Sequence, residues 1–153
     1  MSLLDVAANF LQTEEVHFEQ NEEEHFLRFQ FSGDDTSWMV VFQHLPDSQQ
    51  VIVLSIAPSL VPEAHRASVG EFIHRANFGM LVGNFEIDLD SGEVRFRSSV
   101  DIDDLTVDQH MIRNLIFGNI ATMNIFISPL HKVLHGGLSA VDALQLIDRV
   151  GDA

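Results

Sequence analysis

The sequence has 153 residues, of which 46% are hydrophobic and 20% are charged, a balance that predicts one folded domain with a hydrophobic core and disfavours disorder. Lys and Arg number 8 against 23 Asp and Glu, and the formal charge of −15 disfavours direct binding to nucleic acid or anionic membranes, since both bind basic side chains. The absence of cysteine excludes disulfides, thiolate metal sites and Cys nucleophiles, and it fits a reducing cytoplasm.

The first third of the chain is predicted to hold one helix followed by strands. Residues 2–12 are predicted to form a helix capped by Ser2, because apolar residues recur at the spacing of one helix face. A short strand is expected at residues 16–19. Alternating or continuous apolar residues, separated by turns rich in Gly, Asp and Pro, then indicate three strands. These strands are predicted at residues 25–31, 38–44 and 51–56.

The middle of the chain is predicted to form a helix and then a β-hairpin. Pro62 suits the first turn of a helix that ends near Asn77. Apolar and charged residues alternate on both sides of Ser91-Gly92, within residues 83–100. One register brings the apolar residues to a common face and sets opposite charges across from each other. That register pairs Leu89 with Val94, Ile87 with Phe96, Asp88 with Arg95 and Glu86 with Arg97.

The longest predicted helix begins at a capping box made by Thr106 and Gln109 and runs to about Ser128, before Pro129. Its second half is apolar on nearly every side, and one sheet covers only one side of a helix. Polar residues such as Asn119 interrupt this stretch, so no membrane span is expected. We therefore expect a protein interface here, with five candidate residues: Ile116, Phe117, Ile120, Met123 and Phe126.

A last helix is expected from Ser139 to near Gly151, with Val141, Leu144 and Ile147 buried. The predicted order of elements is α-(β)-β-β-β-α-β-β-α-α. No linker or repeat divides the chain, so residues 1–153 are predicted to form a single domain. Strands in hairpin-connected groups favour an α+β fold, with a largely antiparallel sheet and helices packed on one face.

The sequence carries no recognisable catalytic motif: it lacks both glycine-rich phosphate loops and the GxSxG nucleophile motif. His131 and His135 have the i, i+4 spacing of a metal-binding pair. They lack the Glu that follows the first His in zinc proteases, and two surface histidines near a helix C-terminus are the alternative interpretation. The alternating carboxylates of the hairpin face arginines, which is typical of a structural surface. We predict no catalytic residues, no metal and no cofactor.

Several segments in the middle of the chain carry a family resemblance. They are Val61-Pro62-Glu63, Asn77, Leu81, Gly83-Asn84-Phe85-Glu86, Asp88 and Gly92-Glu93-Val94-Arg95-Phe96-Arg97. These residues resemble the YbjN family, described as bacterial sensory-transduction regulators. That family is similar in fold to class I type III secretion chaperones, whose order of elements matches the predicted order apart from an extra early strand and a C-terminal helix. The resemblance implies a homodimer that binds other proteins, and it implies no catalytic residues.

Together, the residues and the resemblance predict a small, acidic, cytoplasmic, non-catalytic protein that acts as a homodimer on a protein client. Its role would be chaperone-like or regulatory. Two alternatives stay open. One is a small metal-dependent enzyme or sensor that uses His131 and His135, which metal analysis of the purified protein would distinguish. The other is an acidic decoy for a basic nucleic-acid-binding protein, which requires the negative charges to gather on one exposed face.

Overall fold

The structure, a computed structural model, describes residues 1–151 as an antiparallel sheet and four helices. Short 3-10 turns stand at Pro46–Ser48 and Glu63–His65. The elements in chain order are α1 (Leu3–Thr13), β1 (Glu19–Asn21), β2 (Phe26–Ser32), β3 (Ser37–Leu45), β4 (Gln50–Ile56), α2 (Arg66–Asn77), β5 (Asn84–Ile87), β6 (Val94–Asp101), α3 (Gln109–Leu134) and α4 (Ala140–Gly151).

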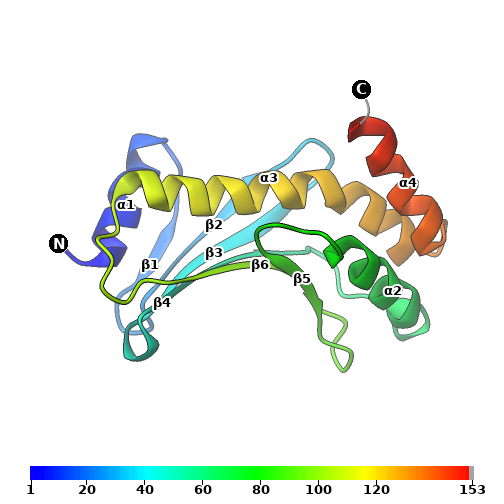
Figure 1. Ribbon diagram of the computed structural model, residues 1–153, viewed down its shortest axis with the longest axis horizontal. Coiled ribbons are helices and arrows are strands. Elements are labelled where there is room, and N and C mark those ends of the chain that lie inside the picture. Colours follow the sequence, from blue (N-terminus) through cyan, green and yellow to red (C-terminus); the bar gives the residue numbers. More distant parts are fainter. Residues whose placement is uncertain (152–153) are drawn as a thin grey trace.

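The sheet has the strand order β1-β2-β3-β4-β6-β5, and every neighbouring pair of strands is antiparallel. Figure 1 shows α3 lying along one face of the sheet, with α1 beside its first half and α2 and α4 beside its second half. The elements predicted from the sequence are all present in the predicted order. The predicted α+β fold class, with a largely antiparallel sheet and helices on one face, is therefore confirmed.

The core lies between α3 and the inner face of the sheet. The register aligns Leu27, Phe42 and Val53 across β2, β3 and β4, so that alternate residues of each strand face the helices. Each large apolar side chain removed from water contributes roughly 1.5–3 kcal/mol. The fully buried members from the strands and from α3 include Leu27, Trp38, Val40, Phe42, Val51, Val53, Phe96, Ile112, Ile116, Met123 and Ile127.

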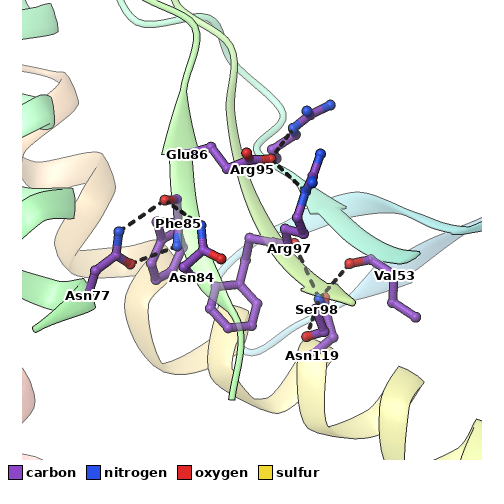
Figure 2. Close-up of polar contacts among 10 residues, drawn as sticks. Val53, Asn77, Asn84, Phe85, Glu86, Arg95, Arg97, Ser98 and Asn119 are labelled. Carbon is purple, nitrogen blue, oxygen red and sulfur yellow. Dashed lines mark hydrogen bonds and ion pairs between the residues drawn. The ribbon is translucent and has the colours of Figure 1, made fainter. Parts of the chain in front are cut away.

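One buried polar network crosses the contact between α3 and the sheet. Trp38 Nε1 on β3 donates to Ser55 Oγ on β4 (3.0 Å), and Ser55 Oγ donates to Asn119 Oδ1 on α3 (2.6 Å). The Asn119 amide nitrogen, with two N–H bonds, lies within hydrogen-bond distance of three acceptors: Ser98 Oγ (3.0 Å), Val53 O (3.0 Å) and Phe96 O (3.2 Å) (Figure 2). Because buried polar groups are costly when unpaired, this network fixes how α3 is rotated on the sheet.

The β5–β6 hairpin has the predicted faces but not the predicted register. The observed pairs are Phe85 with Phe96, Glu86 with Arg95, Ile87 with Val94 and Asn84 with Arg97. Asp88 lies in the turn, where its carboxylate accepts from Asp90 N (2.9 Å) and Ser91 Oγ (3.0 Å). Arg66 also donates to backbone carbonyls of this turn. The predicted register is wrong by two residues, a shift that keeps every side chain on its face.

Helix α3 differs from the prediction at both ends. Its N-cap is Asp108, whose Oδ1 accepts from Met111 N (2.9 Å), so the predicted capping box of Thr106 and Gln109 is wrong. The helix also continues through Pro129 to Leu134. A proline inside a helix costs about 3 kcal/mol, and burial of the following apolar turn offsets that cost. Within the part of the chain that the structure describes, no helix is long and apolar enough to cross a bilayer.

Helix α4 begins as predicted, with Ser139 Oγ accepting from Asp142 N (3.1 Å). Its buried residues near the start are Ala140 and Ala143. Val141, which was predicted to be buried, is exposed. The helix therefore turns its alanines, which allow close approach, toward the neighbouring helices.

The substitution Asn119→Leu is expected to lower the free energy of unfolding by at least about 2 kcal/mol, because it leaves the buried hydroxyls of Ser55 and Ser98 short of partners. Urea denaturation measures the change. The matched control is Asn114→Leu on the exposed side of the same helix, which should stay within about 0.5 kcal/mol of the parent. Equal losses in both variants would contradict the role assigned to the Asn119 network.

Candidate protein-binding surface

A groove of about 590 Å³ lies beside α3, within the size range of binding sites for small ligands. Its floor includes Ser98 and Asn119, two members of the buried polar network. Figure 2 shows these two side chains where α3 crosses β6. The other lining residues are apolar groups and exposed polar groups from α3 and two neighbouring segments: Val82, Asp108, His110, Met111, Asn114, Leu115, Gly118 and Thr122.

Gly118 widens this groove. It lies in the interior of α3, where glycine costs about 0.5–1 kcal/mol relative to alanine. A Cβ atom built at this position would meet no heavy atom within 4 Å. Packing inside the chain therefore does not require a glycine here. What the glycine does provide is access, because a ligand can approach the backbone of α3 closely.

The segment between α2 and β5 exposes three large apolar side chains next to the groove. Phe78, Leu81 and Val82 are 92%, 97% and 69% exposed, and Val82 also lines the groove. Single exposed apolar residues are ordinary, whereas several in five residues form a patch that marks an interaction site. The ends of the segment are fixed by Asn77, which bonds to the Phe85 backbone, as Figure 2 shows.

The opposite face of the sheet carries a second apolar surface, here called the outer band. It consists of Met39, Val41, Ile52, Leu54 and Ile56, and all but Leu54 are half-buried. Arginines flank it on both sides. Arg28 pairs with Glu19, while Arg95 Nε and Arg97 Nε both contact Glu86 Oε1, at 2.7 Å and 3.1 Å (Figure 2). Two arginines thus share one carboxylate on this face.

The five residues of α3 that the sequence offered as an interface lie on the helix sides covered by the chain itself. Ile116, Ile120 and Met123 are buried in the core. Phe117 is half-buried and meets the Phe10 ring edge-on, with ring centroids 5.3 Å apart. Phe126 is half-buried between the rings of Phe72 and Phe85. Helices α1 and α2 thus cover apolar side chains of α3 that the sequence pattern assigned to contact with a partner.

His131 and His135 lie one turn apart at the end of α3, with ring centroids 5.9 Å apart. His131 is half-buried, and among the described residues its Nε2 atom has no hydrogen-bond partner. Burial lowers the pKa of His131 below its ordinary value, the nearby His135 lowers it further, and Asp35 raises it. Over residues 1–147, no three His, Asp or Glu side chains gather in a metal-binding arrangement.

Comparison with known proteins gives a family and a fold. The YbjN family model, "Putative bacterial sensory transduction regulator", matches residues 4–117, which confirms the resemblance seen in the middle of the sequence and extends it to most of the chain. No curated protein matches the sequence.

Two solved structures are similar in fold. A chain in the crystal structure of the ExsC–ExsE complex is 15% identical, with a TM-score of 0.55, covering 85% of this chain and 97% of that chain. YbjN from E. coli, described with its crystal structure as "a putative transcription regulator", is 10% identical, with a TM-score of 0.52 and 94% of each chain covered. These identities show the fold alone, and the predicted similarity to type III secretion chaperones is confirmed at that level.

Lowering the pH from about 7 to 5 is expected to destabilise the fold through His131. Its folded pKa lies below the ordinary 6.5, so the unfolded chain binds the proton first. Between the two pKa values, stability falls as the pH falls, by at most about 1.4 kcal/mol per pH unit. In urea denaturation, His131→Gln should lose less stability over this range than the parent. The exposed His74→Gln variant is the control and should follow the parent, and a parent-like His131→Gln would contradict the prediction.

Proposed function

The chain belongs to the YbjN family, and on this basis we propose that it is a non-catalytic module that binds another protein in a chaperone-like or regulatory role. The observation that carries the proposal is the groove beside α3 together with the exposed side chains of Phe78, Leu81 and Val82. Exposed apolar surface beside a concave site favours a protein ligand, because burying such surface drives association.

The comparisons support the same role at the level of a class. The family is described as regulators of sensory transduction, and one similar fold was crystallised in a complex with a second protein, ExsE. Both facts favour binding to a protein over chemistry on a small substrate, and neither identifies the client. We propose the cytoplasm as the place of action, which the cysteine-free sequence fits.

We further propose that the chain forms a homodimer, with the outer band at the contact. A symmetric contact needs one surface that fits itself, and twofold dimers are the commonest oligomers. The outer band is apolar at its centre. Three of the eight Lys and Arg residues, Arg28, Arg95 and Arg97, lie on this face. These basic residues reduce the repulsion between two copies of an acidic chain at this face. This leaves the groove free for a client.

Light scattering at micromolar concentration is expected to give twice the chain mass of 17.2 kDa. The substitution Val41→Arg puts a charge into the centre of the outer band and should give the mass of one chain. The control Ser68→Arg adds the same charge on the exposed side of α2 and should leave the mass of the dimer unchanged. A parent mass of one chain at every concentration contradicts the homodimer, and a dimeric Val41→Arg contradicts the contact surface.

Affinity capture from cell lysate tests the client-binding role itself. The parent should retain at least one specific protein, and the double variant Phe78→Ser, Leu81→Ser should lose it because the exposed apolar patch is removed. The control is Leu60→Ser, Leu89→Ser, which removes two exposed apolar side chains outside the patch and should behave as the parent. Retention of the same proteins by the patch variant, or of none by the parent, would contradict the proposed function.

A further inference from the structure

The groove reaches β6 at Ser98, where a stretch of the strand begins that has a neighbouring strand on one side only. Strand β4 pairs with β6 as far as Asp101, whose partner is Gln50. On the other side β5 pairs only with Val94–Arg97. The last four residues of β6, 98–101, therefore have an open edge. Such an edge presents N–H and C=O groups at regular intervals, and the structure that satisfies them in series is another strand.

The hydrogen bonds of the hairpin show which backbone groups face the open side. Glu93 O accepts from Asp88 N (2.9 Å) on the β5 side, whereas Val94 O accepts from Ala57 N (2.9 Å) on the β4 side. The two polar groups of a strand residue point the same way, and successive residues alternate. Counting along β6 by twos from Glu93, the backbone groups of Ser99 and Asp101 point to the open side. They lie beyond the end of β5.

The outer edge of β5, by contrast, is closed by a side chain. Asn77 at the end of α2 accepts from Phe85 N through its Oδ1 (2.7 Å) and donates to Phe85 O through its Nδ2 (3.0 Å), as Figure 2 shows. One amide thus occupies both backbone groups that a further strand would need at that position. An incoming strand is therefore excluded at Phe85 and admitted at Ser99 and Asp101.

We propose that the groove binds an extended segment of a partner protein, which adds as a strand to residues 98–101 of β6. This inference rests on the proposed protein-binding function and names the chemistry of the ligand. Alternate side chains of an extended segment point to the same side. On one side they would meet the apolar lining from Met111, Leu115 and Gly118 of α3, so the segment should carry small or apolar residues at every second position.

The charge at one end of the groove adds a second requirement. The chain leaves β6 at Asp101 and reaches the N-cap of α3 at Asp108, and Asp101, Asp103, Asp104 and Asp108 are all exposed. Asp108 also lines the groove. A Lys or Arg at the matching end of the segment complements these carboxylates, and this part of the binding should weaken as salt is added.

Two substitutions separate strand addition from other modes of binding. Gly118→Leu places a side chain in the groove, and its Cβ atom meets no heavy atom within 4 Å apart from the backbone of α3 itself. Its control is Gly70→Leu in α2, where a Cβ atom also meets nothing. Ser99→Pro removes the N–H that faces the open side and leaves pairing with β4 in place, and Ser99→Ala is its control because it keeps that N–H.

The test uses 12-residue peptides selected from a random phage-displayed library on the parent protein, with affinities measured by fluorescence anisotropy. Selected peptides should alternate apolar residues, lack proline and carry Lys or Arg near one end. They should bind Gly118→Leu and Ser99→Pro at least about tenfold more weakly than the parent, and Gly70→Leu and Ser99→Ala like the parent. Urea denaturation of all four variants confirms that each is folded, and Gly118→Ala replaces Gly118→Leu if that variant is not.

Peptides that bind Gly118→Leu as tightly as the parent, or a library that yields none, would overturn the groove as the site. Peptides blocked by Gly118→Leu but indifferent to Ser99→Pro would overturn strand addition. Loss of a dimer in Gly118→Leu would mean that a second copy fills the groove, which also contradicts the proposal. If capture of a client depends on Phe78 and Leu81 while both groove variants capture it normally, this inference fails and the proposed function stands.

Discussion

The contact on which the rest of this structure depends is the buried amide of Asn119. An apolar helix on an apolar sheet can slide or rotate at little cost, because the hydrophobic effect has no direction. The amide removes that freedom, since its partners Ser55 and Ser98 stand on two different strands and each is buried. Once Asn119 faces the sheet, Gly118 must face the side of α3 where the sheet ends. The same contact that fixes the helix therefore places the groove.

The edges of the sheet show a division of roles. Asn77 closes the outer edge of β5. Arg66, the first residue of α2, donates to three backbone carbonyls of the turn after β5 and to a fourth at Val61. Gly83 meets the backbone of Arg97 so closely that a Cβ atom would lie 2.6 Å from its carbonyl oxygen, and its φ of +78° also favours glycine. The chain therefore leaves β6 at a defined point, beyond which residues 98–101 stay open. A small number of residues therefore determines which edge of the sheet is closed and which is open.

The sequence predicts the helices and strands well because their apolar residues recur at regular spacings. It fails where two different structures fit the same spacing. A hairpin shifted by two residues keeps the same alternation, so the pattern could not exclude the wrong pairing of Leu89 with Val94; the turn formed by Asp88 decides it. Pro129 signals a helix end, but tertiary packing of the next turn overrides it. Phe117 and Phe126 are covered by Phe10 of α1 and Phe72 of α2, which are distant in sequence. Only Gly118, unusual inside a helix, hinted at the groove.

The polar side chains around the groove are largely engaged in holding the fold. Asn119 and Ser98 satisfy each other and the sheet, Asp108 caps α3, and His110 lies within 3.2 Å of the Asn114 amide. What the groove presents to a ligand is then mainly apolar surface, next to the open edge of β6. Backbone groups in series recognise an extended chain by its geometry and leave specificity to alternate side chains. A site of this composition is suited to holding an extended segment of protein. The acidic residues between β6 and α3 favour the orientation that places a basic end of the segment beside them.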